Sequence, residues 1–158
     1  MEICGGPFGY TYLLSGNGVS AELRKTILAA DKFEIYSLDP WTQERPGVPT
    51  FHGYKILGTT INQRPEGRKR LFQTIQQSID ETSAEAPTCF NPRHGIRTTT
   101  NGNTVDLVIS FDCFSTKIYA GDQLVETFIH NETAQHGFDD ILRSAGVATS
   151  KRVKQEAK

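Results

Sequence analysis

The sequence predicts an α+β domain, with a mainly antiparallel sheet of five to six strands and about three helices packed on one face. Two turn dipeptides, Asn101-Gly102 and Gly121-Asp122, separate extended stretches rich in β-branched residues, which is typical of hairpins. Apolar residues recur at helical spacing in three other segments. The elements show no regular strand–helix–strand alternation, which favours an antiparallel sheet over a parallel one.

The N-terminal half is expected to contain two helices and two strands. Ser20 is a good N-cap for a short amphipathic helix that runs to about Asp31. Residues 33–38 and 54–61 read as strands, joined by a proline-containing loop at 39–53 that holds the only tryptophan, Trp41. A longer helix begins with Pro65 at its first position, where the missing N–H costs nothing, and fades near Ser83. Its apolar stripe consists of Leu71, Phe72, Ile75 and Ile79.

The Asn101-Gly102 turn fixes the register of the central hairpin. A type I′ turn there places Arg97 opposite Asp106 and His94 opposite Ile109. Since side chains alternate between faces, one face is expected to be the core and the other to be wetter. The core face carries Ile96, Val105, Leu107, Ile109, Phe111 and Cys113, together with His94. The wetter face carries Arg93, Arg97, Asp106, Ser110 and Asp112.

The apolar alternation changes parity at Cys113-Phe114, which predicts a β-bulge or a bend. Counting back from the Gly121-Asp122 turn then places Lys117 opposite Glu126. A final helix follows, with Asn131 or Thr133 as its cap and Gly146 just past its end. Its apolar positions are Phe138, Ile141, Leu142 and Ala145.

Length and composition favour one domain without a global attraction to nucleic acid or membrane. The chain has 158 residues and a net charge of −1. We expect an irregular segment at 1–19, a single domain at 20–148 and a disordered basic tail at 149–158. Three cysteines, an odd and low number, argue against a disulfide scaffold, and no local zinc motif is present. No apolar run is long enough to span a bilayer, and the start lacks the pattern of a signal peptide, so the expected compartment is the cytoplasm unless a leader was removed.

Two stretches resemble a family of uncharacterised bacterial proteins. They are Cys-Phe-Asn-Pro-Arg-His-Gly-Ile-Arg at 89–97 and Val-Asp-Leu-Val-Ile-Ser-Phe-Asp-Cys at 105–113. Similar stretches include Phe-His-Gly-Tyr at 51–54 and Ala-Gly-Val at 145–147. Members of this family read Cys-Phe-Glu-Cys where this chain has Ser-Phe-Asp-Cys at 110–113, so one cysteine is replaced by serine here. The resemblance implies a shared fold over about residues 33–147 and no assigned activity.

Cys89, His94 and Cys113 are the candidate catalytic residues. A thiolate beside an imidazole is the minimum for nucleophilic or metal chemistry. The counted register brings the two thiols close together, although strict alternation would place them on opposite faces. The alternatives are buried cysteines that act as small hydrophobes, which is the commoner outcome, and a hydrogen-bonded core histidine.

Arginines in two places are candidate ligand-binding residues. Arg93 and Arg97, with Asp106 and Asp112, form either a cross-strand set of ion pairs or a clamp for an oxyanion. Arg68 and Arg70 lie in the first two turns of the helix at Pro65, where positive charge opposes the helix dipole. That placement indicates either a solvated helix end or a site for an acidic partner or phosphate.

The sequence therefore favours a small soluble, non-catalytic domain, a monomer or weak dimer, that binds a protein or a small anionic ligand. The alternative is a thiol- or metal-dependent enzyme that uses Cys89, His94 and Cys113. Aromatic residues are not interleaved with the basic ones, which argues against nucleic acid as partner. No cofactor motif, resident metal site or membrane segment is expected, because no glycine-rich phosphate loop, nucleophile elbow or His-Glu-x-x-His pattern occurs.

Overall fold

The computed structural model describes residues 18–41, 46–62, 64–82 and 87–151, which form three helices and seven strands. The helices are α1 (Ala21–Leu28), α2 (Pro65–Asp80) and α3 (Gln135–Ser144). The strands are β1 (Lys32–Asp39), β2 (Thr50–Phe51), β3 (Tyr54–Ile61), β4 (His94–Thr100), β5 (Asn103–Ser110), β6 (Ser115–Ala120) and β7 (Gln123–Ile129).

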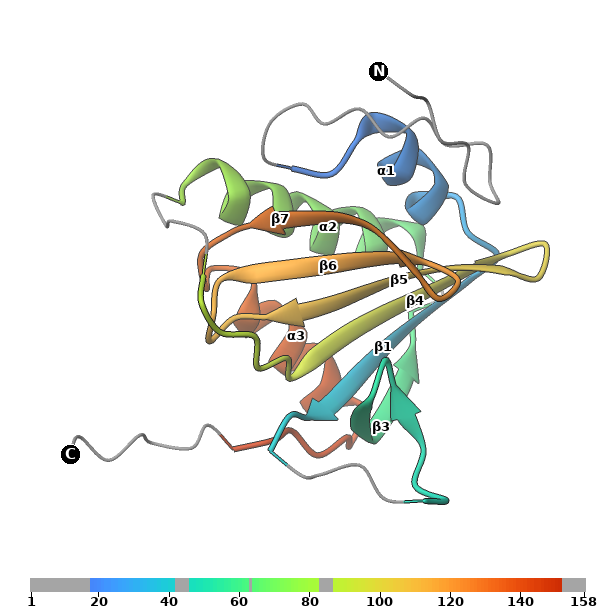
Figure 1. Ribbon diagram of the computed structural model, residues 1–158. Helices are drawn as coiled ribbons and strands as arrows, with labels where there is room; N and C mark the ends of the chain where they lie inside the picture. Colours follow the sequence, from blue (N-terminus) through green and yellow to red (C-terminus); the bar gives the residue numbers. More distant parts are fainter. Residues whose placement is uncertain (1–17, 42–45, 63, 83–86, 152–158) are drawn as a thin grey trace.

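The strands form one antiparallel, curled sheet in the order β2-β3-β1-β4-β5-β6-β7. This confirms the α+β class, with seven strands where five to six were expected. The extra strand is the two-residue β2, which lies in the segment read as a loop. In Figure 1 the strands lie in front of α2 and α3, so those helices pack on one face of the sheet. We call that face the inner face and the opposite one the outer face.

The main core fills the space between the helices and the inner face. It gathers buried side chains from α1, α2, α3 and the central strands, including Ile27, Phe72, Phe138 and Leu107. The stripe expected for α2 is buried in full, and the core-face residues of the central hairpin join it as expected, except for Cys113. Apolar burial of this size is the main stabilising contribution to such a fold.

The outer face carries a second, smaller apolar cluster, which the sequence did not predict. Tyr36, Leu38, Phe51 and Val108 are its buried members. Phe51 comes from the β2–β3 hairpin, whose two turn residues, His52 and Gly53, both have positive φ (50° and 89°). Positive φ at both central positions is what a type I′ turn requires. The hairpin therefore returns over the sheet and covers part of the outer face.

The register of the central hairpin is as predicted. Arg97 pairs with Asp106 and His94 with Ile109, around a turn in which Asn101 and Gly102 have φ values of 49° and 80°. The expectation that its other face is wet was wrong. Asp106 and Ser110 are fully buried and Arg93 is 9% exposed, because the hairpin at His52 and the segment before β4 cover them.

The predicted break near Cys113 is a turn rather than a bulge within a strand. β5 ends at Ser110, and Ser110 pairs with Ser115 across a loop in which Phe114 has a φ of 58°. A bulge lies instead in the next hairpin, where the register shifts between Ile118 and Tyr119. That shift inserts one residue, so Lys117 pairs with Thr127 and the predicted pairing with Glu126 was wrong.

Most helix ends follow their predicted capping chemistry. The Ser20 side chain accepts from Leu23 N at 3.3 Å, and Pro65 occupies the first turn of α2. α3 starts later than expected, with Ala134 at the N-cap and no side-chain cap. Asn131 instead caps the preceding turn through its bond from Thr133 N. Gly146 ends α3 with a φ of 73°, in the paired backbone bonds of a Schellman motif.

The chain after α3 contacts the sheet beyond the boundary expected at residue 148. Ser37 Oγ donates to the carbonyl of Ala148 at 2.6 Å, and Arg93 Nη1 donates to that of Ser150 at 3.2 Å. Trp41 Nε1 also donates to the carbonyl of Lys151 at 3.2 Å, so Ser150 and Lys151 are held by hydrogen bonds, unlike the tail expected there. Residues 152–158 and the N-terminal 1–17 lie outside the described residues. No helix in the described part of the chain is long and apolar enough to cross a membrane.

Candidate functional site

The centre of the outer face is a fully buried carboxylate with an arginine and a histidine as partners. Asp106 of β5 accepts Arg97 Nε at 2.9 Å on one oxygen and Arg97 Nη2 at 2.8 Å on the other. His52 Nε2 lies 2.7 Å from the second oxygen. The Asp106 side chain is 1% exposed, the Arg97 side chain 36% and the His52 side chain 11%. A paired, nearly enclosed carboxylate therefore holds two partly accessible side chains in fixed positions.

Aromatic rings enclose this cluster and fix its geometry. His52 stacks on Tyr119 with ring centroids 4.0 Å apart, and the Arg97 guanidinium lies 5.1 Å from the centre of the Phe51 ring. Phe51 in turn stacks on Tyr36 at 4.5 Å. We call these six residues, Tyr36, Phe51, His52, Arg97, Asp106 and Tyr119, the outer-face cluster.

A strand-interior glycine makes room for the cluster. A Cβ on Gly95 would come within 2.7 Å of Phe51 Cε1 and 3.1 Å of Phe51 Cδ1. Glycine weakens a strand and commonly marks a close approach by another group. Gly95 thus lets the Phe51 ring lie against β4, next to Arg97.

Electrostatics of the cluster favour a charged guanidinium. The hydrogen bonds that Arg97 donates to Asp106 raise the pKa of Arg97 above its usual value despite partial burial. Burial, followed by the charge of Glu34, raises the pKa of Tyr36, and burial raises that of Tyr119. Both phenols therefore remain protonated and able to donate hydrogen bonds at neutral pH.

Three residues of the cluster lie in a row of side chains that crosses six strands of the outer face. Cross-strand pairing aligns Ile61, Glu34, Arg97, Asp106, Tyr119 and Leu124. The two ends of the row are Ile61 and Leu124, which are 47% and 48% exposed. Together with Trp41, they are the exposed large apolar side chains of the described residues. The row thus combines a rigid polar centre with exposed apolar ends.

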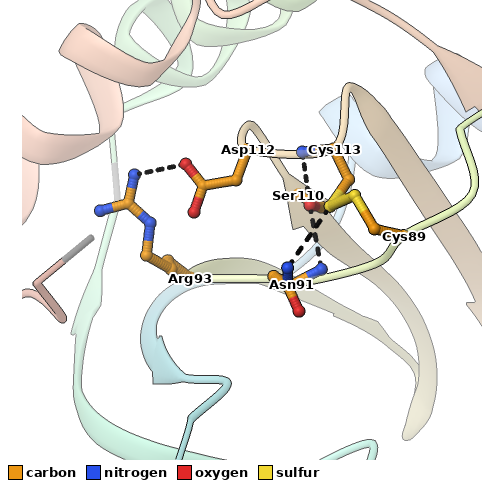
Figure 2. Close-up of a disulfide and its surroundings, with 6 residues drawn as sticks. All are labelled: Cys89, Asn91, Arg93, Ser110, Asp112 and Cys113. Carbon is orange, nitrogen blue, oxygen red and sulfur yellow. Dashed lines mark hydrogen bonds and ion pairs between the residues drawn. A yellow bond between two sulfur atoms is a disulfide. The ribbon is translucent and has the colours of Figure 1, made fainter. Parts of the chain in front are cut away.

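The two candidate cysteines, Cys89 and Cys113, form a disulfide (Figure 2). The odd, low cysteine count had argued against a disulfide scaffold, and strict alternation would have placed the two thiols on opposite faces. The alternation fails because β5 ends at Ser110 and the following turn takes Cys113 off the alternating pattern. Ser110 Oγ orders this turn by accepting from the backbone N–H groups of Asn91 and Cys113. The disulfide therefore joins the segment before β4 to the β5–β6 turn.

Arg93 and Asp112 form a second link between the same two segments. Arg93 Nη2 donates to Asp112 Oδ1 at 3.2 Å, and each side chain is 10% exposed (Figure 2). Arg93 also donates to the carbonyl of Ser150. Arg93 and Asp112 therefore hold chain segments together. Arg93 binds Asp112 and Arg97 binds Asp106, so the two arginines do not form one anion clamp.

His94 lies on the inner face, as the register predicted, and apart from the accessible surface. It is 1% exposed, packs against Phe111 and Phe138, and its Nε2 lies 2.7 Å from Asp139 Oδ1 of α3. Burial raises the pKa of Asp139, but the hydrogen bond and charge of His94 outweigh that effect and lower it overall. His94 pairs with Asp139 of α3, and Cys89 and Cys113 are joined in the disulfide. The three candidate residues therefore do not form one site with a free thiol beside the imidazole.

The two basic residues of α2 have different surroundings. Arg68 is 6% exposed and donates to the carbonyls of Ala30 at 2.6 Å and Asn62 at 2.9 Å, and burial lowers its pKa. Arg70 is exposed. Arg68 thus connects α2 to the segment before β1 and to the segment after β3, which explains its place in the first turns of the helix.

Sequence reasoning missed His52, Tyr36, Phe51 and Tyr119. A usable signal was present, because His-Gly between Phe51 and Tyr54 fits a two-residue hairpin and histidine is enriched at positive φ. Nothing local indicated that His52 would reach Asp106, which is 54 residues away in sequence.

The described residues contain no group of three or more histidine, cysteine or acidic side chains that could hold a metal ion. No protein-family model, curated protein or solved structure matches this chain.

Proposed function

We propose that this chain is a non-catalytic interaction domain that binds a protein partner on the outer face of its sheet, centred on the outer-face cluster. The observation that carries the proposal is the row from Ile61 to Leu124, in which a fixed Arg97–Asp106–His52 arrangement lies between two exposed apolar side chains. Tyrosine, phenylalanine and arginine are enriched at protein interfaces, and tyrosine and arginine dominate their binding energy.

Preorganisation supports this proposal. Stacking of His52 on Tyr119 and of Phe51 on Tyr36 restricts these side chains before any partner arrives. Binding through side chains that are already ordered loses less conformational entropy. A partner would therefore gain affinity from the cluster without ordering it.

Stability alone gives a poor reason for the buried carboxylate. Well-packed apolar residues usually stabilise a fold as well as a buried ion pair does, or better.

The disulfide supports an oxidising compartment as the site of action in place of the cytoplasm, because disulfides persist there.

A photo-crosslinking experiment tests the proposal. A photoreactive phenylalanine at Tyr119 should give one discrete adduct in the cells that make the protein, and the same group at exposed Gln73 of α2 should not. The partner is then identified, purified and titrated against the wild type, Leu124→Ala and the control Arg143→Ala. Weaker binding by Leu124→Ala alone supports the proposal. Equal affinity of all three, or equal crosslinking from both positions, contradicts it.

A small anionic ligand is the second candidate, and the partial exposure of Arg97 favours it. Thermal-shift titration with phosphate, sulfate and dicarboxylates would reveal such a ligand as an increase in melting temperature that Arg97→Lys abolishes. The charge of Asp106 already neutralises Arg97, so we expect the protein partner to be the stronger ligand.

A further inference from the structure

The Cys89–Cys113 disulfide differs at its two ends in access to solvent. Cys89 is an exposed residue, whereas Cys113, in the β5–β6 turn, is 2% exposed. Thiol–disulfide exchange requires an incoming thiolate to reach one sulfur, and the other sulfur leaves. Access therefore directs attack to Cys89 and makes Cys113 the leaving group.

The leaving sulfur has a hydrogen-bond donor beside it. Asn91 Nδ2 lies 3.6 Å from Cys113 Sγ and points at it in Figure 2. The same residue is held in place by its backbone N–H bond to Ser110 Oγ. A fixed donor of this kind stabilises the negative charge that develops on sulfur when the disulfide bond breaks.

Opening the disulfide would act on the outer face through Phe90, the neighbour of Cys89. Phe90 packs on the outer apolar cluster, with Lys117 Nζ 4.2 Å from its ring centre and the Tyr54 ring 6.2 Å away. The Arg93–Asp112 pair remains as a link between the two segments. Neither cysteine belongs to the main core, so the effect of opening is local.

We propose that Cys89–Cys113 is a thiol-exchange site in which a small-molecule thiol attacks Cys89, and that its opening releases Phe90 from the outer face. The attacking thiolate forms a new disulfide with Cys89, while the electron pair of the old bond leaves with Cys113 as a thiolate, which then takes a proton from water. A second thiolate of the same class then attacks the small molecule's sulfur in the mixed disulfide, so that the small molecule leaves as its own disulfide and Cys89 is released as a thiolate that takes a proton from water. The consequence for partner binding rests on the function proposed above, but the exchange itself does not.

Glutathione is the probe, applied to the folded chain with Cys4→Ser so that no other thiol competes. Mass spectrometry of acid-quenched, digested protein should find the glutathione adduct on Cys89 and a free thiol on Cys113. Replacing Asn91 with Leu should slow adduct formation about three- to tenfold, as expected for one lost hydrogen bond. Asn103→Leu, at an exposed position in β5, should leave the rate unchanged.

A second measurement keeps the proposal testable if Asn91→Leu does not fold. NMR spectra of the reduced wild type should show shifts at Phe90, Tyr54 and Lys117 with unchanged core methyl signals. An adduct on Cys113, no adduct at all, equal rates for the Asn91 variant and wild type, or loss of the core signals on reduction would each overturn the proposal. None of these readouts uses a partner, so a failed interaction at the outer face would not be confused with failed exchange.

Discussion

Replacing Arg97 with Ala should destabilise the fold far more than the loss of an ordinary surface ion pair. The substitution removes two charge-assisted hydrogen bonds and leaves Asp106, whose side chain is 1% exposed, with His52 as its remaining partner in the described structure. Removing one member of a buried pair typically costs about 3–5 kcal/mol. Since the Arg97 side chain is 36% exposed, water can partly replace it, and we expect a loss of about 2–3 kcal/mol.

Urea unfolding at neutral pH, with the disulfide intact, measures this loss. Arg143→Ala is the matched control, because Arg143 pairs with Asp140 at 3.2 Å but both side chains are at least half exposed (70% and 50%). That control should change the free energy of unfolding by less than about 1 kcal/mol. The paired substitution Arg97→Met with Asp106→Leu should restore stability to within about 1 kcal/mol of wild type, because it removes both charges together.

Equal effects of Arg97→Ala and Arg143→Ala would refute this reasoning. Such a result would mean that Asp106 is solvated in solution, and the outer face would then be the wet surface that the alternating pattern first suggested. A loss for Arg97→Ala that the double substitution does not recover would instead place the effect in the packing of the guanidinium on Phe51.

Three further predictions test other parts of the structure. Gly95→Ala should cost about 1–3 kcal/mol, because the added Cβ pushes away the Phe51 ring. Gly137→Ala in α3 is the control, because its Cβ would only reach ordinary contact with Leu71 Cδ1 at 4.0 Å, and it should be neutral or stabilising in the same urea assay. Arg68→Gln should lower stability by about 2 kcal/mol, because two carbonyls lose a buried charged donor, and exposed Arg70→Gln should leave the melting temperature unchanged. Burial lowers the pKa of His130, so the unfolded chain binds its proton first and stability should decline as pH falls below about 6.5. His130→Gln should reduce that decline. If stability depends on pH in the variant as it does in the wild type, then the decline does not come from protonation of His130.

The sequence predicted the central hairpin well because its determinants are local. Asn101-Gly102 fixes the turn, and the alternation of apolar residues then assigns His94 to the inner face and Arg97 to the outer one. The same holds for Ser20 at the start of α1, Pro65 at the start of α2 and Gly146 at the end of α3. Each of these signals involves residues within a few positions of one another.

The chemistry of the outer face could not be predicted in the same way, because its cover comes from distant parts of the chain. Alternation tells which face Asp106 occupies, but burial depends on the β2–β3 hairpin that returns over it. The disulfide was not predicted from the sequence for a related reason. The parity argument assumed that the strand continued to Cys113, whereas the turn after Ser110 rotates that residue toward Cys89.

Three features of the outer face are each unfavourable for stability, and they meet at one place. His52 is a non-glycine residue at positive φ, Gly95 interrupts a central strand, and Asp106 is a charge removed from water. The three features depend on one another. Gly95 leaves room for the Phe51 ring of the β2–β3 hairpin, the turn of that hairpin directs His52 toward Asp106, and Asp106 binds Arg97. Departures of this kind concentrate where a protein preserves function at the expense of stability. If the Arg97→Met, Asp106→Leu protein is as stable as wild type and no longer binds the partner, then the cluster is kept for recognition. If it binds as wild type does, then the cluster only orients the hairpin, and the partner must be sought at another surface.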